Sequence, residues 1–368
     1  METITPHLWF DKEAIEAARF YTSVFPRSRV KRVSKITGTP SGDCDIVSFE
    51  LRGQPFEAIS AGPYFKFNPS ISFIVNFDPS KEQKAEQSIN SIWEKLLPGG
   101  TVLMPLQEYP FSKRYGWIQD RFGLSWQLIL SNPEGEDRPD IMPSLLFVGE
   151  SCGRAEEAVT FYTSVFKNSK RGSFMRYDSS QPPEREGTVM FTDFRLQNLW
   201  LAAMDSARDH KFGFNESISL MVNCDTQREI DYYWQKLSAV PQAEQCGWLK
   251  DKFGLSWQIV PRAMQEMMAK ADKVQLDRIT KAFLKMKKFD IKELERAANA
   301  KSVGKKQVAK SKAIAKPGGT LKRKVVAKKT VSKRTSAKKS AHRVKPKKRT
   351  SARGPSTRKA RGKSHSVR

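Results

Sequence analysis

The segment that decides the fold is GWIQDRFGLSWQ at residues 116–127, because it returns as GWLKDKFGLSWQ at residues 247–258. Other blocks repeat in the same order: FYTSVF at 20–25 and 161–166, SIS at 70–72 and 217–219, and IWEKL at 92–96, which returns as YWQKL at 233–237. Repetition in a fixed order indicates a tandem duplication, in which each copy of about 120–130 residues is one structural module.

Hydrophobic periodicity predicts the elements within each copy. Apolar residues at helical spacing predict a helix over residues 14–25, and Ile92, Trp93 and Leu96 mark a second helix. Strand-like runs occupy residues 7–10, 45–51, 56–60, 71–77, 116–118 and 124–130. The sequence therefore predicts an α+β fold in which a β-α-β-β-(α)-β unit occurs twice.

Residues 263–300 follow the second copy and have amphipathic helical character. An apolar stripe runs from Leu276 to Met286, and Asp290 with Glu293 has the pattern of a capping pair that opens a last short helix. We expect this segment to pack on the body or on a dimer mate.

The last 68 residues, 301–368, carry the whole net charge of the chain. They hold 26 Lys and Arg and no Asp or Glu, which equals the excess of 65 basic over 39 acidic residues in the full sequence. They also lack Phe, Tyr and Trp. Such a segment cannot bury enough apolar area to offset the entropy of ordering, so the sequence predicts a disordered tail.

The tail resembles the Lys/Ala/Pro-rich tails of linker histones and bacterial histone-like proteins. Without aromatic or rigid elements, it is expected to bind duplex DNA independently of sequence, through counterion release. The alternatives are a solvated arm or an electrostatic membrane anchor, but the tail offers no Cys or bulky aromatic residue to help such an anchor. The basic clusters comprise Lys322, Arg323, Lys324, Lys328, Lys329, Lys338, Lys339, Lys345, Lys347, Lys348 and Arg349.

The remaining composition favours an intracellular protein. No apolar run approaches the roughly 20 residues of a membrane span, and the first basic residue is Lys12, so no secretory signal is visible. The four cysteines show no CxxC spacing, as expected of reduced thiols. We expect a cytoplasmic, nucleoid-associated protein, or a nuclear one if the host has a nucleus.

The repeated blocks resemble the PhnB-like branch of the glyoxalase/bleomycin-resistance/dioxygenase (vicinal oxygen chelate) superfamily, often labelled a 3-demethylubiquinone 3-methyltransferase domain. The resemblance covers about residues 3–262 and continues through the helical segment. It implies tandem βαβββ modules that form a sheet cup. The domain boundaries follow as 1–134 for module 1, 135–262 for module 2, 263–300 for the helices and 301–368 for the tail.

The resemblance also implies where a ligand lies. In metalloenzymes of the superfamily, a divalent metal takes ligands from the first and last strand of each module, which correspond to His7, Gln127, Ser144 and Gln258. This set contains no carboxylate and one imidazole, a poor donor set for a catalytic ion. We therefore predict no metal and no cofactor, and a ligand pocket of these four residues and Trp9, with His7 as the candidate acid or base.

Other features receive plainer interpretations. The sequence contains no Gly-rich strand-to-helix turn of the kind that would hold a nucleotide cofactor, so it does not support the methyltransferase label. Trp126 and Trp257 are predicted to be core residues, and Cys246 a structural thiol. The aromatic and cationic loop 109–115 either covers the cup, to recognise an anionic or aromatic ligand, or is simply exposed.

The sequence thus predicts a glyoxalase-like small-molecule-binding protein without a catalytic metal, tethered to DNA by its tail. One alternative is an enzyme of the lyase, isomerase or dioxygenase type that uses the same cup. Another is a histone-like architectural protein. The identity of the ligand stays open, and so does oligomeric state, because two modules can close a cup within one chain or across a homodimer.

Overall fold

The computed structural model describes residues 3–132 and 137–300. Its contacts place all of these described residues in a first, compact unit. All helices and strands below belong to the first unit. The predicted DNA-binding tail, with every lysine and arginine named for it, lies outside the described residues.

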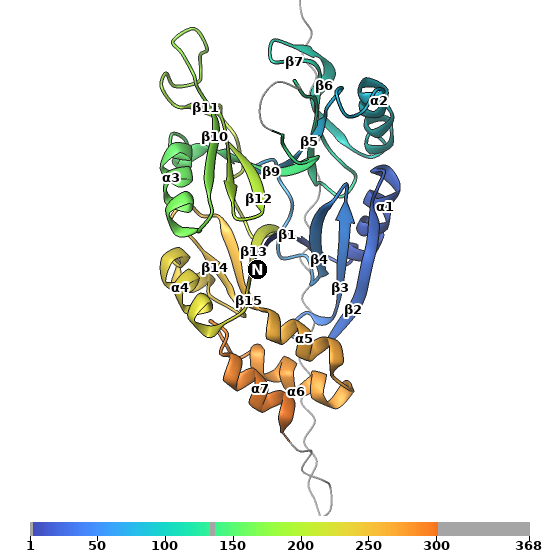
Figure 1. The fold of residues 1–368 in the computed structure, drawn as a ribbon, viewed down its shortest axis with the longest axis vertical. Helices are drawn as coiled ribbons and strands as arrows, with labels where there is room; N and C mark the ends of the chain where they lie inside the picture. The colour runs from blue at the N-terminus through green and yellow to red at the C-terminus, as the bar shows by residue number, and fades with distance from the viewer. Residues whose placement is uncertain (1–2, 133–136, 301–368) are drawn as a thin grey trace, which may run out of the picture. The chain divides into compact units, whose positions relative to one another are not determined.

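The first repeat contains two successive βαβββ units, the first from β1 to β4 and the second from β5 to β8 (Figure 1). Its elements are β1 (Thr3–Phe10), α1 (Ala14–Val24), β2 (Arg29–Thr39), β3 (Gly42–Leu51), β4 (Gln54–Ser60), β5 (Ile71–Phe77), α2 (Ala85–Leu96), β6 (Thr101–Tyr109), β7 (Ser112–Gln119) and β8 (Ser125–Leu130). The sequence pattern did not predict β2 and β6, because the side chains of both strands are mostly exposed and show no sustained alternation of buried apolar and exposed polar residues.

The second repeat follows the same order, with a shorter last part. Its elements are β9 (Ile141–Phe147), η1 (Gly149–Ser151), α3 (Ala155–Val165), β10 (Lys170–Arg176), β11 (Val189–Leu196), β12 (Leu199–Asp205), β13 (Ile218–Cys224), α4 (Gln227–Leu237), η2 (Pro241–Ala243), β14 (Trp248–Lys250) and β15 (Ser256–Pro261). The second half therefore has no counterpart of β6 among its described strands. The α+β fold with two glyoxalase-like repeats is confirmed.

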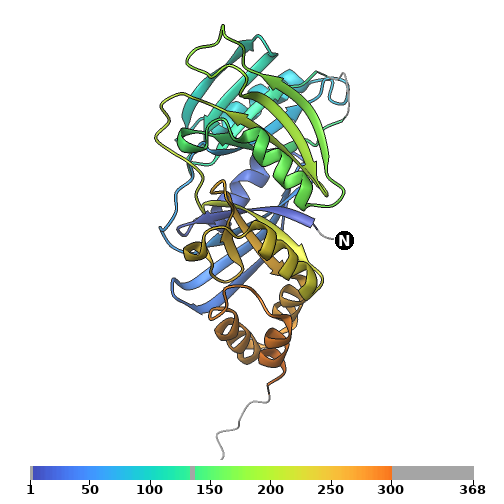
Figure 2. The same ribbon diagram turned by 90° about the vertical axis from the view of Figure 1, so that its left-hand side faces the viewer.

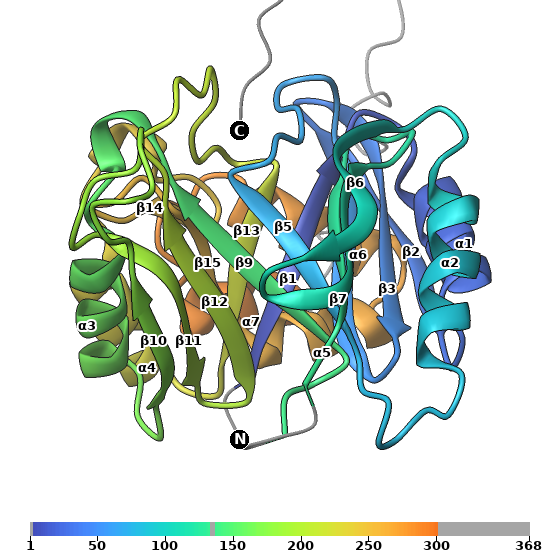
Figure 3. The same cartoon turned by 90° about the horizontal axis from the view of Figure 1, so that it is seen from above.

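The strands form two sheets, and each sheet draws on both repeats. Sheet A has the order β14-β15-β13-β1-β4-β3-β2, and sheet B has the order β10-β11-β12-β9-β5-β8-β7-β6. The repeats join through two antiparallel pairs, β1 with β13 and β5 with β9. Helices α1 and α2 lie on one side of the strands, and α3 and α4 lie on the other (Figure 3). Neither repeat builds a sheet from its own strands alone.

Side-chain alternation divides each strand between a helix-facing core and a second face. On β1, Ile4 and Leu8 are fully buried in the main core, whereas His7 and Trp9 lie on the opposite face. The predicted core role of Trp126 and Trp257 is confirmed, because neither is exposed. Each indole N–H donates to a buried aspartate, Asp120 or Asp251, at 2.8 Å.

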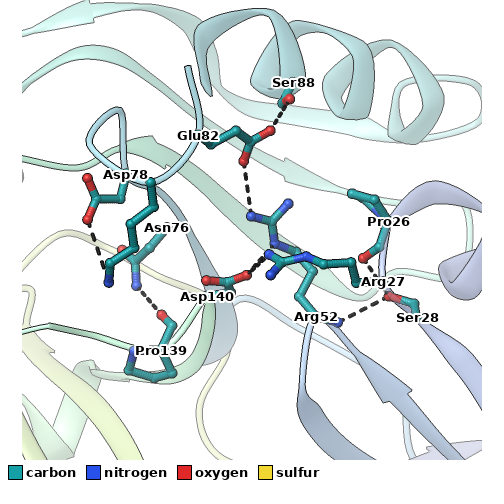
Figure 4. Close-up of polar contacts among 11 residues, drawn as sticks. Pro26, Arg27, Ser28, Arg52, Asn76, Asp78, Glu82, Ser88, Pro139 and Asp140 are labelled. Atoms are coloured by element: carbon teal, nitrogen blue, oxygen red, sulfur yellow. Dashed lines mark hydrogen bonds and ion pairs between the residues drawn. The ribbon is translucent and has the colours of Figure 1, made fainter. Parts of the chain in front are cut away.

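An ion-pair cluster ties the segment before β9 to the first repeat (Figure 4). Arg52 lies at the turn between β3 and β4, and 3% of its side chain is exposed. Its guanidinium donates to Asp140 at 3.0 Å and to Glu82 at 3.2 Å, and Arg27 also pairs with Asp140. Because a buried guanidinium without carboxylate partners is costly, the cluster fixes how the second repeat enters sheet B.

Three further helices pack against one end of sheet A (Figure 2). They are α5 (Arg262–Lys270), α6 (Lys273–Phe283) and α7 (Ile291–Asn299). Ile279, Phe283 and Leu294 share a buried cluster with Ile36 of β2 and Met221 of β13.

The predicted start of the last helix is also confirmed. Asp290 is the N-cap of α7 and accepts from the Glu293 backbone N–H at 2.9 Å. As for membrane insertion, residues 3–132 and 137–300 include no helix that combines the length and the apolar character of a membrane span.

Candidate functional site

A cavity of about 700 Å³ lies on the face of sheet A that points away from the main core. Its walls come from β1, β2, β3, β4, β13, β14 and β15, and from α5, α6 and the loop after α6. The C-terminal helices add apolar side chains to it, among them Met264, Met268 and Phe283. A cavity of this size is typical of sites for small organic ligands.

His7 lies in the middle of this cavity wall. In the sheet it pairs with Ser219 of β13 on one side and with Glu57 of β4 on the other. Burial lowers the pKa of His7 to about 3, so its imidazole is neutral at pH 7. Its Nδ1 atom is buried and has no hydrogen-bond partner within the described residues.

Glu57 is the acidic group of the site, and sequence reasoning missed it. It lies between Phe56 and Ala58, whose side chains are buried on the helix-facing side of β4. Ser48 Oγ donates to its Oε2 at 2.9 Å. Burial raises the pKa of Glu57 to about 7. The sequence did contain a signal for this residue: Glu57 is the one carboxylate on β4, at a position whose side chain points away from the helix-facing core.

Gln258 of β15 completes the polar part of the wall. Its Nε2 donates to Ser219 Oγ at 2.9 Å. Its Oε1 receives no hydrogen bond from any group that the structure describes. The cavity thus presents a carboxyl group on β4, an imidazole nitrogen on the adjacent strand β1, and an amide oxygen on β15, which β13 separates from β1.

Aromatic side chains next to His7 form a further part of the lining, and the His7 ring itself contacts Trp248 edge-on, with centroids 5.5 Å apart. Trp9 contacts Trp248 edge-on, with ring centroids 5.8 Å apart, and Phe65 at 5.1 Å. The indole N–H of Trp9 donates to the Gly62 carbonyl at 2.8 Å, which fixes the ring. Tyr64, which is 65% exposed, stands at the mouth of the cavity.

The five predicted pocket residues do not meet in one place. His7, Trp9 and Gln258 line the sheet A cavity, whereas Gln127 and Ser144 belong to strands β8 and β9 of sheet B. The correction has a topological reason: each repeat contains two βαβββ units, and pairing of β1 with β13 and of β5 with β9 places the two units of one repeat in different sheets. The first and last strands of the same repeat therefore end up in different sheets.

In sheet B, the corresponding glutamine is satisfied by the protein itself. Gln127 Oε1 accepts from the Tyr115 hydroxyl at 2.7 Å, and its Nε2 donates to Ser72 Oγ at 2.7 Å. The same face carries an apolar cluster that includes Met142 and Trp200, and the Arg138 guanidinium lies 3.9 Å from the Trp200 ring centroid. On this face both ends of the Gln127 amide therefore have protein partners, whereas the buried Ser144 hydroxyl has none among the described residues.

The loop over residues 109–115 is the β6–β7 hairpin of sheet B. Tyr109, Phe111 and Tyr115 pack on one another, with ring centroids 5.0–5.6 Å apart. These residues are not part of the lining of the sheet A cavity. Cys246 does line that cavity, but burial raises the pKa of its thiol, which is the opposite of what a reactive cysteine needs.

One family model matches both repeats, over residues 2–129 and 139–260, and its description is 3-demethylubiquinone-9 3-methyltransferase. The chain belongs to this family. Membership confirms the resemblance that the repeated blocks indicated. No curated protein matches the chain.

Solved structures similar to this member of the family cover one repeat or both. The PhnB protein from Bacillus cereus is 36% identical and spans 34% of this chain and 98% of its own, with a TM-score of 0.31. A Staphylococcus aureus protein is 29% identical over 35% and 96%, with a TM-score of 0.15. Glyoxalase I from Zea mays is 11% identical over 73% and 97%, with a TM-score of 0.45.

The divalent metal of the wider superfamily does not fit the residues of this family member. The positions that the resemblance implies for ligands, His7 and Gln258 in one sheet and Gln127 and Ser144 in the other, cannot surround a single ion. In the part of the chain that the structure describes, no three His, Cys, Asp or Glu side chains form a group that could hold a metal. A catalytic zinc site ordinarily has three protein ligands; in the described cavity lining, His7 and Glu57 are direct neighbours, but no third His, Cys, Asp or Glu side chain joins them in a group.

Proposed function

We propose that this protein binds a small organic molecule in the sheet A cavity without a catalytic metal, and that residues 301–368 hold it on DNA without sequence preference. The observation that supports the first part is a built but incomplete polar site. His7 Nδ1 and Gln258 Oε1 lack protein donors or acceptors in the described chain, although both lie on the wall of an open, largely apolar cavity. A buried polar atom without a partner, such as His7 Nδ1, is uncommon, so a ligand is expected to supply one.

The first test is elemental analysis of the purified chain, together with a native mass spectrum under conditions that retain ligands. The proposal predicts no stoichiometric divalent metal and one retained molecule for each chain. A stoichiometric metal would refute the metal-free part of the proposal and direct attention to His7 and Glu57 as its ligands.

The DNA tether rests on the charge of the tail alone. A duplex of arbitrary sequence should bind the full chain, and the affinity should fall steeply as salt increases, because binding releases condensed counterions. A variant that lacks residues 301–368 should lose this binding while its ligand cavity stays intact. Binding that survives the deletion would refute the tether. Compaction of DNA by the full chain would favour the architectural alternative. The proposed location is therefore the nucleoid, or the nucleus of a host that has one.

A second candidate function is catalysis in the same cavity. The observation that favours it is the pair of His7, which is neutral at pH 7, and Glu57, whose pKa burial raises to about 7. A carboxyl group with a pKa near 7 is suited to general acid–base catalysis. Turnover that follows a titration near pH 7 and is lost in Glu57→Gln would establish this function.

A further inference from the structure

The lining of the sheet A cavity contains a half-buried carboxyl group, that of Glu57, and the cations that act on it within the described residues, Lys31 and Arg32, are exposed. Glu57 accepts one hydrogen bond, from Ser48, and takes part in no ion pair among the residues that the structure describes. Burying an ionised carboxylate without a cation is costly, so in the protein without a ligand the carboxyl group tends to stay protonated. A cationic ligand would remove the need for that proton.

The polar groups next to Glu57 offer few hydrogen-bond donors: Ser48 donates one hydrogen bond to it, and neutral His7 carries one ring N–H. His7 is its direct neighbour across β1 and β4, and Ser219, the other neighbour of His7, binds the amide nitrogen of Gln258. His7 Nδ1, next to Glu57, therefore has no partner among the described residues, and neither does Gln258 Oε1, which lies further along the same wall on β15. A ligand group with several N–H donors would satisfy this patch, because an ammonium group carries donors only.

The remaining charges of the lining do not favour an anion. The lining contains one further acid, Glu216, which is already paired with Lys250 at 2.9 Å. Its only permanently cationic side chain within the described residues is Arg32, which is exposed. An anionic ligand would therefore face Glu57 at depth without a buried cation to offset the repulsion.

The apolar lining indicates what carries the charged group. The rings of Trp9, Trp248 and Phe65 lie in the same cavity as Glu57, together with methionine side chains from α5. Aromatic rings attract cations through their faces and also bury flat apolar molecules. The cavity is thus suited to a cation on an aromatic body.

We propose that the sheet A cavity binds a protonated amine carried on an aromatic or similarly apolar body, with Glu57 as its counter-ion and Gln258 Oε1 and His7 as further acceptors. This inference rests on the proposed binding function and adds the chemical class of the ligand. It concerns sheet A only, because Gln127 in sheet B already has both of its amide groups bonded.

Binding of a cation should depend on pH through Glu57. The other titratable or charged groups around it are His7 on β1, Lys31 and Arg32 on β2, Cys44 on β3, and Glu216 and Cys246 across the cavity. His7 stays neutral across this range because burial lowers its pKa to about 3. Ionised Glu57 attracts the amine and protonated Glu57 does not, so affinity should fall about tenfold from pH 8 to pH 6.

The test is calorimetric titration of the full chain, in buffer with EDTA, with three probes that share an indole ring. Tryptamine carries an ammonium group, tryptophol a neutral hydroxyl group and indole-3-acetate a carboxylate. The proposal predicts one tryptamine for each chain, at least about tenfold tighter binding of tryptamine than of either other probe, and the stated weakening at pH 6.

A matched pair of variants assigns the effect to Glu57. Glu57→Gln keeps the size of the side chain and an acceptor for Ser48, and it should remove both the preference for tryptamine and the pH dependence. Glu50→Gln is the control, because Glu50 lies on the neighbouring strand β3, pairs with Lys31 and is not part of the cavity lining. It should leave both properties unchanged. Should Glu57→Gln fail to fold, the three probes and the pH series on the natural chain still decide.

The outcomes separate this inference from the proposed function. Equal binding of tryptamine and tryptophol, or tighter binding of indole-3-acetate, would overturn the amine inference while leaving a small-molecule site in place. Tryptamine binding that is unchanged in Glu57→Gln would also overturn it. If none of the three probes binds, the cavity itself fails as a site for aromatic-sized ligands, and the proposed function fails with it.

Discussion

Sheets A and B have the same arrangement of units, but a cavity borders the closing glutamine in sheet A, whereas protein groups bind both ends of that glutamine's amide in sheet B. Each joins one unit from the first repeat to one from the second, and each has a glutamine at the same position of its closing strand, Gln258 or Gln127. In sheet B the side chains of Tyr115 and Ser72 bind the Gln127 amide. In sheet A the face around Gln258 borders a cavity of about 700 Å³. The two sheets therefore share the same frame and differ in the side chains that lie over the closing glutamine.

The difference between the sheets lies in the strand that precedes the last one, which is β7 in sheet B and β14 in sheet A. In sheet B, β7 runs over eight residues and brings Tyr115 to Gln127. In sheet A, β14 has three residues, and the backbone N–H groups of Cys246 and Gly247 donate instead to Met286 and Lys287 after α6. Because the C-terminal segment takes the place of the missing strand, no tyrosine hydroxyl reaches Gln258. The helices thereby shape the cavity and leave its acceptors free.

The largest expected effect concerns the frame that the two repeats share. Asp120 and Asp251 each accept two backbone N–H groups and one tryptophan N–H, and both are buried. Asp120→Ala and Asp251→Ala should each lower the free energy of unfolding by about 4 kcal/mol, because these donors lose their partner. Urea unfolding measures the cost. A nearly neutral effect at either position would show that the repeats do not share this frame.

The second prediction concerns how the stability of the protein depends on pH through Glu57 in sheet A. Because the folded-state pKa of Glu57 is raised to about 7, the folded state holds a proton that the unfolded state releases near pH 4. This group therefore makes stability fall as pH rises from about 4.5 to 7, by about 3 kcal/mol, with no further loss above pH 7. Glu57→Gln should remove this fall in the unfolding free energy, and Glu50→Gln should retain it. An unchanged pH profile in Glu57→Gln would contradict the assignment.

The third prediction compares the two glutamines directly. Gln127→Leu leaves the Tyr115 hydroxyl and Ser72 without their partner in a filled interior, and it should cost about 2 kcal/mol of unfolding free energy. Gln258→Leu removes one protein hydrogen bond, to Ser219, and should cost about 1 kcal/mol. Thermal or urea unfolding of both variants tests the order. A larger cost at Gln258 would mean that sheet A, too, depends on this side chain for its interior.

The smallest effect is expected at Tyr115. Tyr115→Phe removes one hydroxyl from the sheet B network and should cost about 1 kcal/mol of unfolding free energy. Binding of tryptamine should remain unchanged, because Tyr115 is not part of the sheet A cavity. A weakened affinity in this variant would place the binding site on sheet B instead.

Sequence patterns predicted the repeats and most elements because these depend on local periodicity. The exposed strands β2 and β6 escaped, since their side chains carry no apolar alternation. Strand pairing between repeats also escaped, because register across hundreds of residues leaves no local trace. Gln127 and Ser144 were therefore assigned to the same cup as His7, although they lie in sheet B.

The candidate site was only partly predictable for the same reason. His7, Trp9 and Gln258 were found from their place in the family pattern and their strand parity. Glu57 was missed because it belongs to a strand in the middle of the repeat, which becomes the neighbour of β1 only through parallel pairing. The part of the cavity that α5 and α6 supply depends on tertiary packing, which an amphipathic stripe alone does not locate.

The central claim is that sheet A holds the ligand and sheet B fills itself. The most direct measurement is a crystal structure of the protein soaked with small aromatic fragments. The account predicts fragment density in the sheet A cavity, between Trp248 and Met268, and none over the Trp200 face of sheet B. Density on sheet B, or a sheet A cavity closed by its own side chains, would contradict it.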